Sequence, residues 1–212
     1  MALTDTDNTL LHTAENDVAA TPAVTNFQAE RTALLYLQAP VALVTALAVA
    51  CLIAIGLWGV VDHGMLMLWV GLQSVQTMFR AGVVWSYRHA SDADRRDPRW
   101  VQLYFVGTLI SGVVWGCIGL FIGPGTPVVH QVLVMMGLAG VLAGAISSYA
   151  VLMPVYIAFM APAMLIAVQS MQMQVNQSQH VMGLLFLVFA GALLVIARNY
   201  SNSVASTLAL RT

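Results

Sequence analysis

Lysine is absent from this sequence, and charge of either sign is scarce. Only 8% of the 212 residues are charged, whereas 59% are hydrophobic, and the mean hydropathy is +0.82. So small a polar fraction cannot coat a water-soluble globule of this size. The composition therefore predicts a protein that resides in a lipid bilayer.

The sequence also lacks the usual signatures of catalysis. Its two cysteines, Cys51 and Cys117, lie in long apolar stretches, and their number and spacing give neither a disulfide framework nor a zinc site. No phosphate-binding glycine loop, HExxH, GxSxG or nucleic-acid-binding motif is present. The longest soluble loop is too short to house a catalytic domain. We therefore expect no enzymatic activity from this chain alone and no nucleic-acid partner.

Long apolar runs dominate what is present. Crossing about 30 Å of hydrocarbon takes roughly 20 mainly apolar residues in a helix. Six such runs follow one another along the chain: Pro40–Val61, Met65–Tyr87, Val101–Ile122, Val132–Ala150, Pro154–Met171 and Met182–Ala197. Because the runs are continuous and not alternating, they favour helices over a closed barrel. The expected fold is an all-α integral membrane protein, a bundle of six transmembrane helices.

The arginines predict its orientation, since basic residues in short loops favour the cytoplasmic side. With the amino terminus inside, Arg31, the charged loop Arg88–Arg99, Arg198 and Arg211 all lie inside, and the three outer connections contain no arginine. Both termini are thus expected in the cytoplasm. The polar residues 1–30 lack a secretory signal and are predicted to be a disordered cytoplasmic tail.

A polar stripe interrupts the second apolar run. Gln73, Gln76, Thr77 and Arg80 recur at i, i+3, i+4 and i+7 and so share one helical face. Amides in hydrocarbon need partners, so this face is expected to look into the bundle or toward another subunit. Two interpretations of Arg80 stay open: its side chain snorkels to lipid headgroups, or the stripe forms a polar pocket or coupling element. Two residues of the third run complete this candidate ligand or coupling site: Ser111 and Trp115.

Small residues form two ridges that predict close helix packing. One ridge lies in the fourth run and consists of Gly137, Gly140, Gly144 and Ser148. A shorter ridge beside Trp115 lies in the third run and consists of Gly107, Ser111, Gly112 and Gly116. Each ridge is interpreted either as an internal packing seam or as a dimer interface.

The outer rim of the predicted bundle gathers histidines and thioethers. Its candidate metal ligands are His63, His130, His180, Met65, Met67, Met171 and Met173. Imidazole with thioether suits copper, imidazole with the carboxylate of Asp62 suits zinc, and two histidines can ligate haem. The histidines can also act as a proton sensor. The alternative is a generic polar rim, because outer loops need polar residues and no two histidines have the i, i+4 spacing of a preformed ligand pair.

Carboxylates are missing from all six runs. Proton-coupled carriers and pumps usually need a buried carboxylate, so a small transporter is the least favoured of the functions considered.

A family resemblance rests on the run Ser111–Gly116, on Pro124 and Pro127 with His130 and Gln131, on the ridge Gly137–Gly144, and on Pro154 and Pro162. This pattern resembles the amino-terminal six-helix membrane sensor (MASE-like) modules of bacterial diguanylate cyclases and sensor histidine kinases, over most of residues 31–212. The resemblance implies an input domain in the bacterial inner membrane, a homodimer, and a last helix that leads into a cytoplasmic output domain.

The sequence after the sixth run fits that implication. Residues 198–212 contain no proline or glycine, and Val204, Leu208 and Arg211 recur at helical spacing. We therefore expect a tail at 1–30, a sensor domain at 31–197 and the start of a signalling helix at 198–212, as the sensory part of a longer polypeptide or a partner of a separate output chain. The stimulus stays open between a small molecule, a metal, a proton and bilayer tension. The alternative function is a metal- or haem-binding redox membrane protein.

Overall fold

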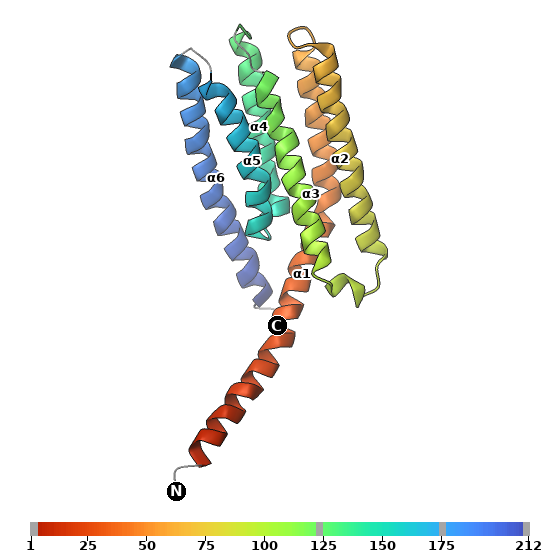
Figure 1. The fold of residues 1–212 in the computed structure, drawn as a ribbon, viewed down its shortest axis with the longest axis vertical. Helices are drawn as coiled ribbons and strands as arrows, with labels where there is room; N and C mark the ends of the chain where they lie inside the picture. The colour runs from red at the N-terminus through yellow and green to blue at the C-terminus, as the bar shows by residue number, and fades with distance from the viewer. Residues whose placement is uncertain (1–3, 122–124, 174–176, 210–212) are drawn as a thin grey trace.

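The computed structural model describes residues 4–121, 125–173 and 177–209, and over these ranges it is helical with no strand (Figure 1). The six long helices are α1 (Thr4–Leu57), α2 (His63–His89), α3 (Arg99–Gly116), α4 (Val128–Tyr149), α5 (Met153–Gln172) and α6 (Gln177–Ala209). Short 3-10 turns follow at Asp94–Arg96 and Cys117–Phe121. The all-α prediction is confirmed for the described residues, and each helix contains most of one predicted apolar run.

Five of the six helices are long and apolar enough to cross a membrane. These segments are Glu30–Leu57, Arg99–Phe121, Val128–Tyr149, Met153–Gln172 and Gln179–Thr207. They indicate a membrane protein. Helix α2 has 27 residues and is long enough as well, but its polar stripe lowers its mean hydropathy, so a sixth span there stays a prediction.

The amino-terminal segment differs from the expectation. Helix α1 begins at Thr4, so residues 4–30 continue the helix of the first span, whereas we expected a disordered tail. The segment contains no glycine and a single proline, Pro22, so little in it interrupts a helix that is already nucleated by the apolar span. Its cytoplasmic location stays a prediction.

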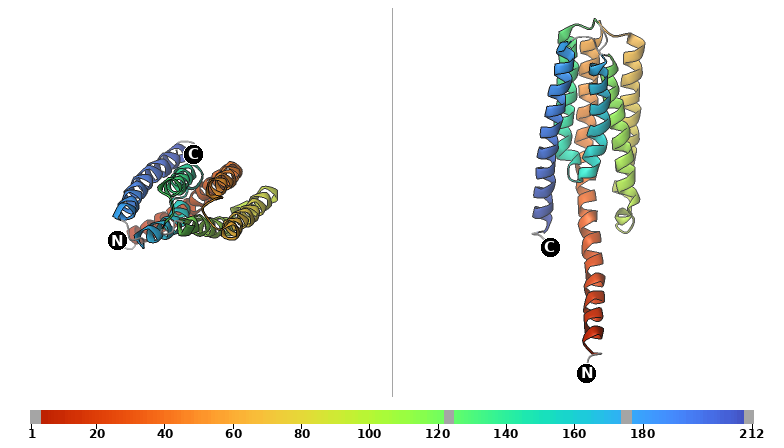
Figure 2. Two further views of the ribbon diagram at one scale, coloured as in Figure 1. Left: turned by 90° about the horizontal axis from the view of Figure 1, so that it is seen from above. Right: turned by 60° about the vertical axis from the view of Figure 1, so that its left-hand side comes forward.

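The helices stand side by side with α3 and α5 at the centre. Helix α1 contacts α2 and α4, α3 contacts α2 and α5, and α6 contacts α5 and α4. Helices α2 and α6 therefore lie on opposite sides of the bundle (Figures 1 and 2). Helices α1, α3 and α5 end, and α2, α4 and α6 begin, at the upper end of Figure 1, while at the lower end α6 contacts α1 through Ser201 and Arg31.

Glycines of α3 and of the 3-10 turn after it bring this segment into close contact with α5. Added Cβ atoms at Gly116 and Gly119 would lie 3.0 Å and 2.8 Å from the Cα atoms of Ala163 and Ala167, and one at Gly112 would overlap the carbonyl oxygen of Phe159. Only glycine permits so close an approach. The ridge predicted in the third run is thus an internal packing seam.

The ridge of α4 divides into two parts. Gly137 packs against Ile53 of α1, as expected for a seam, but Gly140 and Gly144 have no atom within 4 Å of an added Cβ. The ridge is therefore an internal seam at Gly137 but not at Gly140 and Gly144, where the dimer-interface interpretation stays a prediction. One further glycine is conformationally special, because Gly125 has φ +91° in the α3–α4 connection.

The charged loop at the lower end is ordered by its own arginines. Arg95 donates hydrogen bonds to the carbonyl oxygens of Tyr87 (3.2 Å) and Arg88 (2.6 Å), which satisfies the last turn of α2. Arg99 pairs with Asp94 and Asp97. The loop thus caps α2 and joins it to the start of α3.

Candidate functional site

A buried arginine lies at the centre of the polar stripe. Arg80 is 6% exposed, and its Nη1 donates a hydrogen bond of 2.7 Å to the hydroxyl of Tyr149 on α4. Its Nη2 lies 3.4 Å from the hydroxyl of Thr108 on α3. The guanidinium also stacks over the rings of Tyr104 and Tyr149, at 5.2 and 5.1 Å from their centroids. Arg80 thus points into the bundle, and the snorkelling interpretation is wrong.

Among the residues that the structure describes, no acidic side chain forms an ion pair with Arg80. Two hydroxyls and two π faces therefore offset the cost of burying this cation, each by about 0.5–3 kcal/mol. Gly107 leaves room for the side chain, because a Cβ there would lie 3.3 Å from Cγ of Arg80. The arginine ties α2 to both α3 and α4.

The two glutamines of the stripe form a second polar group. Gln73 and Gln76 are buried, and the amide nitrogen of Gln76 donates to the side-chain oxygen of Gln73 at 3.0 Å. The same nitrogen lies 3.4 Å from the hydroxyl of Thr77, which is half-buried. The predicted inward orientation of this face is confirmed for Gln73, Gln76 and Arg80. Leu72, by contrast, is exposed.

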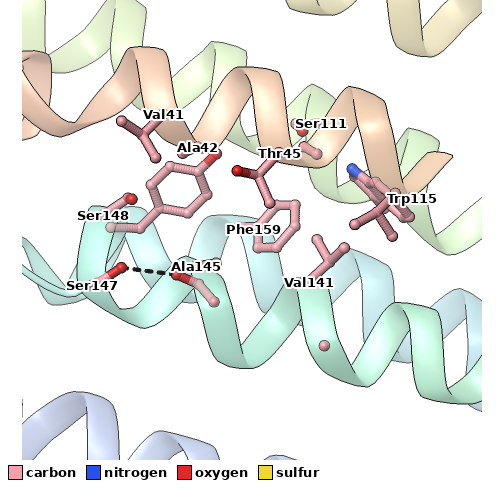
Figure 3. Close-up of a pocket in the computed structure, with 15 residues that line it drawn as sticks. Val41, Ala42, Thr45, Ser111, Trp115, Val141, Ala145, Ser147, Ser148 and Phe159 are labelled. Carbon is pink, nitrogen blue, oxygen red and sulfur yellow. Dashed lines mark hydrogen bonds between the residues drawn. The ribbon is translucent and has the colours of Figure 1, made fainter. Parts of the chain in front are cut away.

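A cavity of about 250 Å³ lies between α1 and α4 (Figure 3). Its mouth is formed by exposed residues on the two helices, among them Val41, Gly140 and Gly144. Its floor consists of buried side chains from α3 and α5 behind and from the end of α4: Ser111, Trp115, Phe159 and Tyr149. The cavity exists because Gly140 and Gly144 carry no side chain where α1 faces α4. Ser111 and Trp115, predicted as pocket residues, both line it.

Tyr149 joins the cavity to the buried arginine. Its ring lines the cavity, and its hydroxyl accepts the hydrogen bond from Arg80. The ring also packs edge-on against Phe159, with centroids 5.3 Å apart. A molecule in the cavity would therefore contact Tyr149, which accepts the hydrogen bond from the buried Arg80.

The lower part of α6 is bonded to both helices of the cavity mouth. The hydroxyl of Tyr200 donates to the carbonyl oxygen of Ser147 on α4 (3.4 Å), and Ser147 lines the cavity. Arg31 on α1 donates to the carbonyl oxygen (3.4 Å) and the hydroxyl (3.3 Å) of Ser201. A change in the spacing of α1 and α4 would act on α6 through these bonds.

The outer-rim residues do not form a common site. The described ranges contain no group of three or more His, Cys, Asp or Glu side chains that could hold one metal ion. His63 stacks on Trp58 and lies 2.7 Å from its carbonyl oxygen, while Nδ1 of His180 lies 2.6 Å from Gln172. These two histidines begin α2 and α6, on opposite sides of the bundle, and His130 lies in the first turn of α4.

The remaining rim candidates point in different directions. Met65, Met67 and Met173 are exposed, whereas Met171 is fully buried in the core. Asp62, considered as a zinc ligand, accepts a hydrogen bond from the backbone of Met65 and caps α2. Helix capping thus accounts for Asp62 and ring stacking for His63.

Sequence reasoning missed Tyr149, Arg31 and Tyr200 as members of the site, and also Thr45, which lines the cavity from α1. Tyrosines near the ends of apolar helices usually mark the membrane interface, so Tyr149 and Tyr200 gave no signal of contact with Arg80 or α4. The neighbouring serines of α4, Ser147 and Ser148, were the one available hint, because a polar pair in an apolar helix needs a polar neighbour or a cavity.

Comparison of the chain with known protein families, with curated proteins and with solved structures finds no match.

Proposed function

We propose that this chain is a membrane-embedded sensory input domain of a bacterial signalling protein in the inner membrane. A stimulus changes the packing of α1 and α4 around the cavity, and α6 passes the change to a cytoplasmic output such as a diguanylate cyclase or a histidine kinase. The observation that carries this proposal is the attachment of α6 to both helices of the cavity mouth, through Tyr200 and Ser147 and through Arg31 and Ser201.

The length of α6 supports its role as the output helix. It has 33 residues, which at about 1.5 Å per residue give about 50 Å, well beyond the roughly 30 Å of hydrocarbon in a bilayer. The excess lies at the lower end, beyond Ala197, where the apolar run stops. A helix that leaves the membrane as one rigid rod can transmit a rotation or shift to a domain attached to it.

The energetic scale of the links is appropriate for a switch. Intramolecular hydrogen bonds contribute about 0.5–1.5 kcal/mol each, and coupling between allosteric sites is typically about 1–3 kcal/mol. Two or three such bonds therefore suffice to carry a signal, and they are weak enough to rearrange. A homodimer, which the resemblance implies, would let the α6 helices of two copies act on one output. The redox alternative has no comparable support in the described residues, because the candidate ligands are dispersed.

The proposal is tested by joining the chain through its carboxyl end to a diguanylate cyclase domain and measuring cyclic dinucleotide synthesis in membranes. The double variant Tyr200→Phe, Ser201→Ala removes two hydroxyls that bind α4 and α1, and we expect it to change output by about fivefold. The control is Ser203→Ala, because the hydroxyl of Ser203 bonds only within α6, to Asn199. Equal output from wild type, control and double variant would contradict transmission through α6.

A further inference from the structure

The floor of the cavity holds a hydrogen-bond donor without a partner. Trp115 is 1% exposed, and its indole Nε1 has no hydrogen-bond partner among the described residues. Figure 3 shows this nitrogen on the edge of the ring that faces Thr45 and Ser111. Trp69, which packs edge-on against Trp115, donates from its own Nε1 to the carbonyl oxygen of Val114 at 2.8 Å. The nitrogen itself is covered by its neighbours, so an acceptor in the cavity reaches it only when a side chain beside it, such as Thr45, moves aside. An unmade bond of this kind costs about 1–3 kcal/mol, which that contact would recover.

The walls exclude a charged occupant. The residues that line the cavity are apolar or carry hydroxyls, such as Thr45, Ser111 and Ser148, and none of them is charged. Arg80 stands behind the ring of Tyr149 and is not part of the wall. An ion taken from water into this site would lose its hydration without gaining a counter-charge. The occupant must therefore be uncharged.

The mouth and the volume define the occupant further. Gly140 and Gly144 are exposed on the outer face between α1 and α4, so the cavity opens sideways, toward lipid if the bundle spans a bilayer. A dry protein cavity of about 150 Å³ accommodates benzene. The volume of about 250 Å³ here fits a molecule somewhat larger than one aromatic ring and much smaller than a phospholipid.

We propose that this cavity binds a small uncharged amphiphile drawn from the bilayer. Its apolar body lies against Val141 and Phe159, and its carbonyl or similar acceptor takes the hydrogen bond from Nε1 of Trp115. The inference rests on the proposed function only in making this molecule the stimulus, because binding itself requires no output domain. A carbonyl of this kind comes either from a free molecule dissolved in the membrane or from the ester group of a bilayer lipid.

The binding test uses the complete chain in nanodiscs of ether-linked phosphatidylcholine, which has no ester carbonyl. The probe is radiolabelled octan-2-one, with unlabelled octan-2-one, octane and octylammonium as competitors. We expect saturable binding that octan-2-one competes, that octane competes about fivefold more weakly because it lacks the acceptor, and that octylammonium does not compete. Absence of saturable binding, equal competition by octane, or competition by octylammonium would overturn the proposal.

Two variants locate the probe within the structure. Gly144→Leu fills the cavity and is expected to abolish saturable binding, whereas Gly71→Leu on α2, also with no atom within 4 Å of its added Cβ, is expected to leave binding unchanged. Trp115→Phe should weaken the binding of octan-2-one about fivefold and leave the affinity for octane unchanged. Two results would contradict this placement of the probe in the cavity. One is unchanged binding in Gly144→Leu, and the other is an equal loss of affinity for octan-2-one and octane in Trp115→Phe.

Repeating the titration in ester-linked lipid separates the two sources. Weaker apparent binding than in ether lipid identifies the lipid ester as a competing natural occupant, and equal binding identifies a free molecule; both results support the chemistry of the site. The two proposals also fail separately. If octan-2-one does not bind but the α6 double variant changes output, the ligand class is wrong; if it binds but the α6 variant has no effect, the sensory function is wrong.

Discussion

Replacement of Gly112 by alanine should destabilise the bundle by opening the seam between α3 and α5. A Cβ at this position would lie 2.8 Å from Cγ of Pro162 and closer still to the carbonyl oxygen of Phe159. Ordinary contacts of a Cβ begin at 3.4 Å, so the two helices must separate by several tenths of an ångström or more. Both obstructing atoms belong to backbone or to a proline ring, which cannot rotate away.

The cost follows from the contacts that share the seam. Gly116 and Gly119 also pack closely on Ala163 and Ala167, with added Cβ atoms at 3.0 and 2.8 Å, so separation at Gly112 loosens these contacts too. A gap of about 0.5–1 Å forfeits a quarter to a half of each dispersion contact, and overpacking of a tight core typically costs about 1–3 kcal/mol. We expect Gly112→Ala to lose about 2–3 kcal/mol of the free energy of unfolding.

The assay is reversible unfolding of the chain in mixed micelles of dodecyl sulfate and a mild detergent, followed by circular dichroism and tryptophan fluorescence. Gly140→Ala is the matched control, because its added Cβ meets nothing within 4 Å. We expect this control to remain within about 0.5 kcal/mol of wild type or to gain slightly from the better helix propensity of alanine. An unaltered unfolding midpoint for Gly112→Ala, or an equal loss of unfolding free energy in both variants, would refute the close packing of α3 on α5.

Three further predictions concern the polar stripe and the topology. Tyr149→Phe removes the hydroxyl that accepts from Arg80 and should cost about 1.5–3 kcal/mol in the same unfolding assay, as for other hydrogen bonds to charged groups; a loss below about 0.5 kcal/mol would mean that the bond is not formed. In the cyclase fusion, Gln76→Leu should alter output more than Leu72→Ala, because only the first side chain is buried, and equal, negligible effects would make the stripe incidental. Reporter fusions after Gly125 and at the carboxyl end should report opposite sides of the membrane, and both on one side would contradict the six-span topology.

Helix positions and the inward face of α2 could be predicted because they depend on local pattern. Continuous apolar runs specify helices wherever they occur, and amides at one helical phase must turn away from lipid. The partner of Arg80 could not be predicted in the same way. Tyr149 lies 69 residues away along the chain, and the two meet only because the long side chain of Arg80 reaches across the assembled bundle to α4.

The small-residue ridge of α4 shows a second limit. Gly137 and Gly140 are equivalent in the sequence pattern, yet one packs tightly on Ile53 and the other borders a cavity. The difference depends on which side chains α1 presents at each level, and this follows from the mutual placement of two helices and not from either sequence alone. The histidines of the outer rim failed as a site for a related reason: they share one end of the bundle but belong to helices on different sides of it.

The coupling of the cavity to α6 is tested most directly by a distance measurement with paired spin labels. Labels at His89 on α2 and Asn202 on α6, both exposed, report the position of α6 relative to the bundle once the two native cysteines are replaced by alanine. Filling the cavity with Gly144→Leu should shift the distance distribution by about 1–2 Å, the usual size of a signalling helix movement, while Gly71→Leu leaves it unchanged. Superimposable distributions in wild type and Gly144→Leu would contradict the account.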